Sequence, residues 1–156
     1  MMNFKRLIIF TFIIGFFTFA YAQESLSVSI TSFKNLQDDK GNYTELYYKI
    51  SRDKIQFIEE ESAFIAPYNI SLTVLNENNE NIYETSYKSG IRAKSKNQTD
   101  LSQDILDIIK FYLNPGKYSY RLHLSGDGLV EEMIKEGNIN IPQFSDTKLQ
   151  LSQIEL

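Results

Sequence analysis

The sequence has no cysteine and no tryptophan, and it has only one histidine. Without cysteine the chain has no disulfide, no thiolate metal ligand and no thiol nucleophile. A lipoprotein anchor is excluded for the same reason, because the lipid is attached to a cysteine. No G-x-S-x-G, no H-E-x-x-H and no glycine-rich phosphate loop occurs either. The fold must therefore be held by packing alone, and the most recognisable catalytic motifs are missing.

The single histidine, His123, alternates with Leu122 and Leu124. Neighbouring residues of a strand point to opposite faces, so two leucines directed into a core predict an outward histidine beside Arg121 and Lys117. No carboxylate precedes His123 at strand spacing on its own face, so nothing is placed to orient the ring as a general base. We expect a solvated strand residue rather than a catalytic group.

The formal net charge is −4, and carboxylates are plentiful. A mildly acidic surface argues against nucleic acid and against anionic membranes as partners. The carboxylates lie mostly in predicted turns, and no two of them are set apart as the acid pair that a glycosidase requires. We therefore expect no catalytic residue, no cofactor and no metal ligand.

The chain opens with MMNFKRLIIFTFIIGFFTFAYAQES. Lys5 and Arg6 precede an apolar run over 7–20, and the small-residue pattern A-Y-A ends at Ala22. This order predicts a secretory signal peptide over residues 1–22, since a membrane-spanning helix needs about 20 apolar residues. The segment carries two positive charges and no negative one, so its removal changes the net charge from −4 to −6. We expect export to the periplasm or the exterior of a bacterial cell.

Apolar and polar residues alternate through most of the remaining chain, which is typical of half-buried strands. The longest alternation runs from Phe64 to Val74, with Pro67 on the opposite parity. Because proline cannot donate to a strand ladder, Pro67 predicts an edge position, a bulge or a break. The pattern predicts an all-β fold, an antiparallel immunoglobulin-like β-sandwich of about 7–8 strands, over residues 23–142.

Several boundaries follow from the same pattern. Residues 55–57 are predicted to start a strand, 90–99 to form a surface loop, and 129–141 to form a weaker strand. Residues 101–112 carry apolar side chains at helical spacing, yet they are rich in isoleucine and aromatic residues and lead into a Pro-Gly turn. The second set of signals favours a strand from about Ile105.

Tyrosine is abundant, with ten residues. Tyr43, Tyr47 and either Tyr83 or Tyr87 are candidates for outward faces. Exposed tyrosines stack on sugars or anchor protein partners, which makes Tyr47 a candidate binding residue. The competing interpretation, which the sequence favours, is cross-strand pairing that only stiffens the sheet.

Residues 143–156 are predicted to form a C-terminal tail that packs on the sandwich or extends from it. Chain ends are usually polar, whereas this one is apolar at several positions. Exposed apolar patches and open sheet edges are where partners bind. The predicted partner-binding residues of the tail are Leu149, Leu151, Ile154 and Leu156.

Four stretches of the chain resemble one known family. They are LYYKISRDKIQFI, SAFIAPYNISLTVLNENNENI, LNPGKYSYRLHLSGDG and NIPQFSDTKLQLSQIEL. Over residues 26–156 they are similar to the N-terminal β-sandwich region of secreted bacterial GWxTD-domain proteins, and the closing segment 144–156 is the most distinctive part. The resemblance implies a β-sandwich and export, and it transfers no activity and no functional residue. The domain that bears Gly-Trp-x-Thr-Asp is absent, so we expect either a short stand-alone relative or the incomplete N-terminal part of a larger protein.

These observations predict an exported, non-enzymatic β-sandwich that binds another protein or has a structural role in the cell envelope. The alternative is a carbohydrate-binding module that uses exposed tyrosines. We expect no nucleic acid partner and no membrane association after signal cleavage. The pattern does not indicate the oligomeric state.

Overall fold

The structure is a computed structural model, and it describes residues 24–35, 41–60, 63–100 and 103–144. These residues form eight strands and two short 3-10 turns, and they contain no α-helix. The predicted all-β class is therefore confirmed. The strands are β1 (Leu26–Phe33), β2 (Asn42–Ile50), β3 (Ile58–Glu60), β4 (Ala63–Asn76), β5 (Asn81–Ala93), β6 (Ile105–Leu113), β7 (Gly116–Ser125) and β8 (Met133–Ile141).

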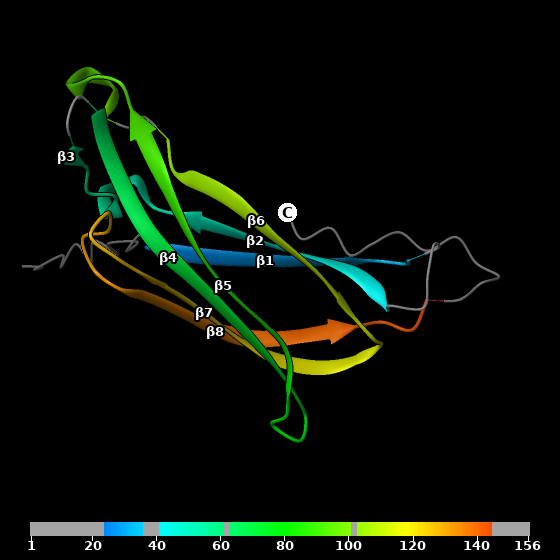
Figure 1. The fold of residues 1–156 in the computed structure, drawn as a ribbon. Helices are drawn as coiled ribbons and strands as arrows, with labels where there is room; N and C mark the ends of the chain where they lie inside the picture. Colours follow the sequence, from blue (N-terminus) through cyan, green and yellow to red (C-terminus); the bar gives the residue numbers. More distant parts are fainter. Residues whose placement is uncertain (1–23, 36–40, 61–62, 101–102, 145–156) are drawn as a thin grey trace, which may run out of the picture.

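The strands pair into two antiparallel sheets. One sheet has three strands in the order β1-β2-β6. The other has five strands, with β4 paired to β5 on one side and to β7 on the other, and with β8 beyond β7. The short β3 lies on the β7 side of β4, because β5 already occupies the opposite side of the same residues. Figure 1 shows the long β4–β5 pair running obliquely to β1 and β2, with its hairpin tip projecting from the body.

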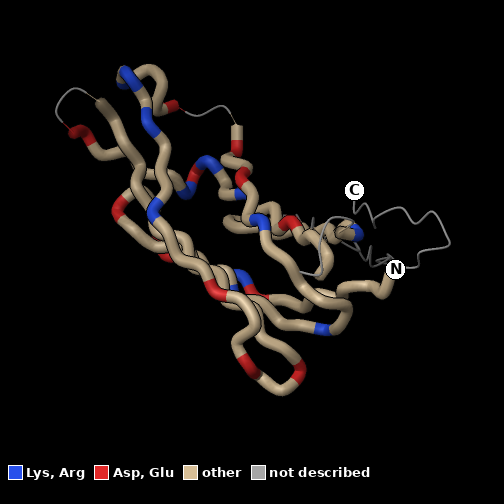
Figure 2. Tube along the Cα trace, turned by 45° about the vertical axis from the view of Figure 1, so that its right-hand side comes forward, with Lys and Arg blue, Asp and Glu red and all other residues tan. Residues whose placement is uncertain are grey.

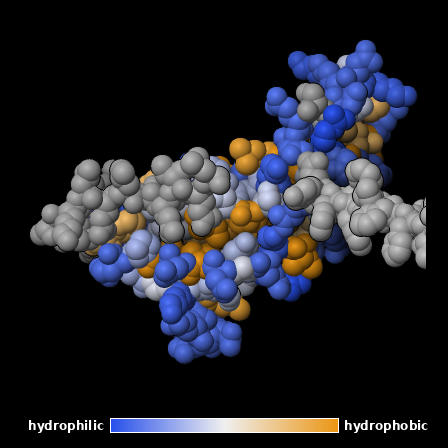
Figure 3. Space-filling model, turned by 180° about the vertical axis from the view of Figure 1, so that it is seen from behind, coloured by the Kyte–Doolittle hydropathy of each residue, from blue (hydrophilic) through white to orange (hydrophobic). Residues whose placement is uncertain are grey.

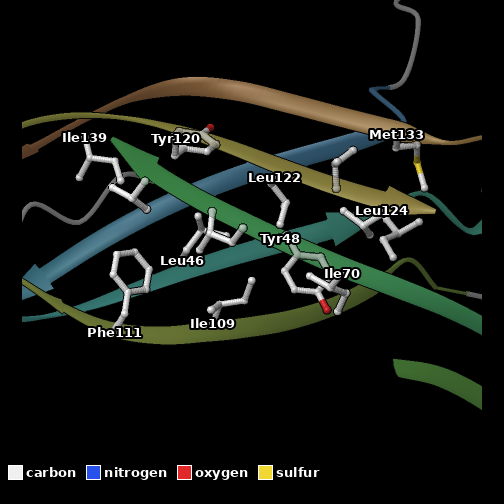
Figure 4. Close-up of a cluster of buried hydrophobic side chains, with 14 of the residues drawn as sticks. Leu46, Tyr48, Ile70, Ile109, Phe111, Tyr120, Leu122, Leu124, Met133 and Ile139 are labelled. Carbon is white, nitrogen blue, oxygen red and sulfur yellow. The ribbon is translucent and has the colours of Figure 1, made fainter. Parts of the chain in front are cut away.

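The core lies between the two sheets. Strand β2 alternates strictly between buried and half-buried residues, so its inward set meets the inward sets of β4 and β7. Figure 4 shows these side chains pointing toward one another from both sheets. Fully burying one such aliphatic side chain contributes about 1.5–3 kcal/mol. The apolar residues with 0–1% exposure are Leu46, Tyr48, Ile50, Ala66, Ile70, Leu72, Val74, Leu113, Leu122 and Leu124.

Pro67 sits where β4 loses one of its two neighbours. On one side of β4, Pro67 pairs with Gly90 of β5. On the other side, the pairing of β4 with β7 begins only at Asn69, so Pro67 has no partner in β7. The Pro67 carbonyl accepts a hydrogen bond from the Gly128 N–H at 2.8 Å. Because the N–H and C=O of one strand residue point to the same side, the missing proline donor faces away from β5. Of the predicted alternatives, the structure shows a break in the strand pairing on that side, between the residues of β4 that pair with β3 and those that pair with β7.

The predicted starts of two strands, at residues 55 and 129, are wrong. Ile55 forms an isolated bridge with Leu129, and the strands begin later, at Ile58 and at Met133. The two segments pair only over this short stretch, through hydrogen bonds from Gln56 N–H to the Gly128 carbonyl and from Val130 N–H to the Lys54 carbonyl. Their apolar residues pack against the core without extending a ladder, which is why local alternation suggested longer strands.

The prediction of a surface loop over 90–99 is also wrong in part, because β5 continues to Ala93. This strand is mostly polar, since one of its faces is directed to solvent and the other is only partly covered, and so it lacks an apolar period. The prediction of a strand from Ile105 is confirmed by β6. Pro142 follows β8, as expected.

The predicted signal segment, 1–22, and the tail residues Leu149, Leu151, Ile154 and Leu156 lie outside the described residues. Within the part of the chain that the structure does describe, no helix is both long and apolar enough to cross a membrane.

Candidate functional site

The outer face of the three-stranded sheet gathers aromatic side chains from strands that are far apart in the sequence. The register of β2 with β1 and with β6 places outward residues side by side in rows across the sheet. We call this surface the aromatic face. Its rows are Phe33–Tyr43–Tyr112, Thr31–Glu45–Lys110, Ser29–Tyr47–Ile108 and Ser27–Lys49–Leu106.

The first row is a continuous line of three rings. The ring centroids of Phe33 and Tyr43 are 6.2 Å apart, and those of Tyr43 and Tyr112 are 5.7 Å apart. Both separations fall in the range in which aromatic pairs attract each other. Phe33 is nevertheless 38% exposed and Tyr112 is 44% exposed. The row is thus ordered by its neighbours while two of its rings remain accessible to a ligand.

Glu45 ties two tyrosines to the centre of the face. The Tyr43 hydroxyl donates to Oε1 at 2.9 Å, and the Tyr47 hydroxyl donates to Oε2 at 2.6 Å. The ammonium of Lys110 lies 3.9 Å from Oε1. The Glu45 side chain is only 13% exposed, so these bonds hold the two rings along β2. The aromatic face is therefore preorganised, which reduces the entropy lost when a ligand binds.

The same contacts set the charge of the site. The hydrogen bond from Tyr47 is the main reason why the pKa of the Glu45 carboxyl is lowered. The acceptor carboxylate in turn raises the pKa of the Tyr47 phenol. Desolvation, with a smaller effect of Glu45, raises the pKa of the Tyr43 phenol. At neutral pH the centre of the face is one carboxylate flanked by two neutral phenols.

Aliphatic side chains extend the surface beyond the tyrosines. Ile108 lies opposite Tyr47, and Leu106 lies opposite Lys49 and is 68% exposed. A single exposed leucine is ordinary, but here it continues a patch that already contains exposed rings. Figure 3 shows hydrophobic side chains reaching the surface along the body of the molecule, whereas the two projecting ends are mostly hydrophilic.

The outward positions predicted for Tyr43 and Tyr47 are confirmed. Tyr83 and Tyr87 lie on the face of β5 that is directed toward the other sheet. Tyr83 stacks on Phe111 between the sheets, with centroids 4.8 Å apart, whereas Tyr87 is 37% exposed. The sequence pattern missed Phe33 and Tyr112. The apolar residues around position 112 also match helical spacing, and that ambiguity hid the outward parity of Tyr112.

His123 points outward between two buried leucines, as predicted. The expectation that it lacks a carboxylate partner is wrong, because its Nε2 lies 3.2 Å from Oε2 of Glu132. Glu132 comes just before β8 and lies two residues from Ile134, which pairs with His123, so the contact depends on the pairing of β7 with β8 and not on spacing along one strand. Both side chains are substantially exposed, and solvent screens a pair of this kind.

A shallow groove of about 600 Å³ lies on the outer face of the five-stranded sheet. Its charged residues, Arg121 and Glu136, form an ion pair at 2.6 Å across β7 and β8. The ring of Tyr120 packs closely against Gly137, where a Cβ would lie 2.7 Å from the ring. With its two charges paired, the groove offers less for recognition than the aromatic face.

Charged residues are distributed over the described part of the chain without forming one dense cluster (Figure 2). Among them, no group of three or more histidine, aspartate or glutamate residues is placed to hold a metal ion. Figure 2 shows basic and acidic residues interspersed along the tube, with many of them in the turns.

Comparison with known proteins adds little. No family model and no curated protein matches the chain. Among solved structures, the chain is similar to a candidate beta-galactosidase from Bacteroides fragilis, with a TM-score of 0.40 and 13% identity. The match covers 69% of this chain and 15% of that one. The likeness is too weak to establish a shared fold or a shared activity.

Proposed function

We propose that this protein is an exported, non-enzymatic, immunoglobulin-like β-sandwich module that binds another protein through the aromatic face. The observation that carries this proposal is the exposed row Phe33–Tyr43–Tyr112, held in place across three strands. Export rests on the signal-peptide pattern of residues 1–22. The resemblance to the N-terminal region of GWxTD-domain proteins belongs to the same proposal.

The composition of the face favours a protein ligand. Tyrosine is enriched among the residues that dominate binding energy at protein interfaces, because its ring is large, has few rotamers and carries a polar end. Lys110 lies in the row next to the accessible rings, and Ile108 and Leu106 follow in the next two rows, the last of which also contains Lys49. The face thus combines aromatic and aliphatic anchors with charged groups, as specific interfaces do.

A photocrosslinking experiment tests the proposal. A benzophenone amino acid replaces Tyr112, and the variant is expressed in the bacterium that produces the protein. We expect one discrete protein adduct, and we expect Phe33→Ala in the same chain to reduce its yield severalfold. Lys117, exposed on the outer face of the other sheet, is the matched control position. Equal adducts from positions 112 and 117, or none from 112, would refute the protein-binding proposal.

A carbohydrate ligand is the second candidate, and the cluster around Glu45 favours it. Two phenols that flank a carboxylate on the outer face of a sheet present rings and hydrogen-bonding groups together. Binding on a glycan array that is lost in Tyr47→Ala would identify a carbohydrate module and replace the protein ligand. An array without binding would count against it.

The C-terminal tail is a further proposed contact. If Leu149, Leu151, Ile154 and Leu156 bind the partner, truncation after Phe144 should abolish the crosslinked adduct and leave the β-sheet circular dichroism signal unchanged. Unfolding of the truncated chain would instead assign these residues to the core.

A further inference from the structure

Strand β5 exposes one complete edge of the five-stranded sheet. It pairs with β4 along its length, and among the described residues no strand pairs with its other side. Tyr83 reaches Phe111 of the opposite sheet, but this is a contact between rings and not a ladder. A free edge of 13 residues is a ready template for another strand.

The hydrogen bond at Pro67 shows which backbone groups lie on this edge. Its carbonyl points away from β5, toward Gly128, so Pro67 and Gly90 form a pair that is not hydrogen-bonded. In an antiparallel ladder such pairs alternate with hydrogen-bonded ones. The alternation directs the N–H and C=O groups of every second β5 residue away from β4, toward the free edge, and these residues are exposed. They are Glu84, Ser86, Lys88, Gly90 and Arg92.

The charges on this edge are complementary to a second copy of themselves. If two β5 strands run antiparallel about a two-fold axis at Ser86, the two Ser86 residues face each other. Glu84 of each copy then lies opposite Lys88 of the other, which gives two attractive cross-strand pairs. Lysine at an edge normally opposes pairing with other chains, but in this register each lysine meets a carboxylate.

Neighbouring registers are less favourable. An axis at Lys88 places Glu84 of each copy opposite Arg92 of the other, but it also places the two lysines directly opposite each other at the centre of the contact, which offsets these attractive pairs. An axis at Tyr87 places Lys88 opposite Ser86 and Glu84 opposite Gly90, so no opposite charges meet. The Ser86 register also places Thr85 of one copy opposite Tyr87 of the other, and Tyr87 is one of the exposed large side chains of the protein.

We propose that the protein forms a two-fold homodimer by antiparallel pairing of β5 with β5 of a second copy, centred on Ser86. The two five-stranded sheets become one continuous sheet, and the aromatic face of each copy stays free. A closed two-fold contact uses the same patch on both subunits. Both β5 edges are then paired, so assembly through this edge stops at the dimer.

The mass of the purified protein, measured by sedimentation over a range of concentrations, tests the proposal. We expect a dimer, and we expect Ser86→Pro to be monomeric with an unchanged circular dichroism spectrum. The Ser86 N–H points away from β4, so proline removes only the donor used between copies. If Ser86→Pro fails to fold, the charge variants decide alone.

The charge variants also identify the register. Lys88→Glu and Glu84→Lys each replace two attractive pairs by repulsive ones, and we expect each to weaken dimerisation about tenfold or more. The double exchange Glu84→Lys with Lys88→Glu should restore it. Lys117→Glu, which makes the same charge change on β7, should have no effect.

Several results would overturn the dimer. They are a monomer at every concentration, a dimer that survives Ser86→Pro, or a double exchange that fails to rescue. Loss of the dimer in Tyr112→Ala would place the contact on the aromatic face instead. A monomer whose β5 captures a strand of a different protein would show that the edge serves another partner.

Discussion

Tyr47 donates its phenolic hydrogen to Oε2 of Glu45 at 2.6 Å, and the two residues are two positions apart on the same face of β2. Tyr43 approaches the same carboxylate from the other side along the strand. A single half-buried acid thus fixes two rings of the aromatic face.

Tyr47→Phe keeps the ring and removes the hydroxyl. We expect a small loss in the free energy of unfolding, because a hydrogen bond to a charged group is lost at a solvent-exposed site. Urea denaturation measures this loss from the shift in midpoint at constant slope. Tyr43→Phe is the matched variant and should behave similarly, since its hydroxyl binds the other oxygen of Glu45. Two variants as stable as the parent would show that Glu45 does not hold the rings.

The stability of the protein should decrease in acid partly because of Glu45. Folding lowers the pKa of its carboxyl, chiefly through the Tyr47 hydrogen bond. A lowered pKa in the folded state contributes stability above the pKa of the unfolded chain, and this contribution is lost as the pH falls through the folded-state pKa. Asp104, whose pKa is lowered by the Arg52 backbone N–H, acts in the same direction.

Glu45→Gln isolates the contribution of Glu45. We expect the free energy of unfolding to depend less steeply on pH below about pH 5 in this variant than in the parent. Asp104→Asn provides a comparison at a site remote from the two tyrosines. An unchanged pH profile in Glu45→Gln would show that the carboxylate titrates alike in the folded and unfolded chains.

The alternation of apolar and polar residues predicts which face of a strand each side chain occupies. It does not predict which residues of neighbouring strands lie side by side. The parity of β2 was enough to place Tyr47 outward, because a period of two separates the faces without any knowledge of neighbouring strands. The row that makes the aromatic face requires β6 beside β2 in a specific register, so that Tyr112 meets Tyr43. Such long-range pairing leaves no trace in a short stretch of sequence.

The sequence did not indicate the open edge of β5, for a different reason. Strand β5 is predominantly polar, because it contributes little to the core, and therefore its last residues resemble a loop. The partner of His123 was missed because Glu132 lies in a connecting segment whose path depends on tertiary packing. Sequence patterns identify buried faces well, and they describe edges and connections poorly.

Truncation of a buried and of an exposed leucine should separate the core from the aromatic face. Leu122 is fully buried between the sheets, and Leu122→Ala should cost about 2–5 kcal/mol of unfolding free energy through lost burial and the remaining cavity. Leu106→Ala makes the same chemical change at an exposed position and should cost less than about 0.5 kcal/mol. The two variants are compared by urea denaturation. A similar loss in both would mean that Leu106 is covered in solution.

Gly128→Ala should destabilise the fold more than an ordinary loop substitution. A Cβ at Gly128 would lie 2.2 Å from the Ala66 carbonyl carbon and 2.4 Å from the Pro67 nitrogen, and both atoms belong to the backbone and cannot rotate away. The Gly128 N–H also donates to the Pro67 carbonyl, so moving the segment to relieve the clash would break that bond. We expect a loss of about 3 kcal/mol or more in the free energy of unfolding. Asp127→Ala, at the exposed neighbouring position, should stay within about 0.5 kcal/mol of the parent. If Gly128→Ala were as stable as the parent in thermal and urea unfolding, the close packing of this turn against Pro67 would not exist in solution.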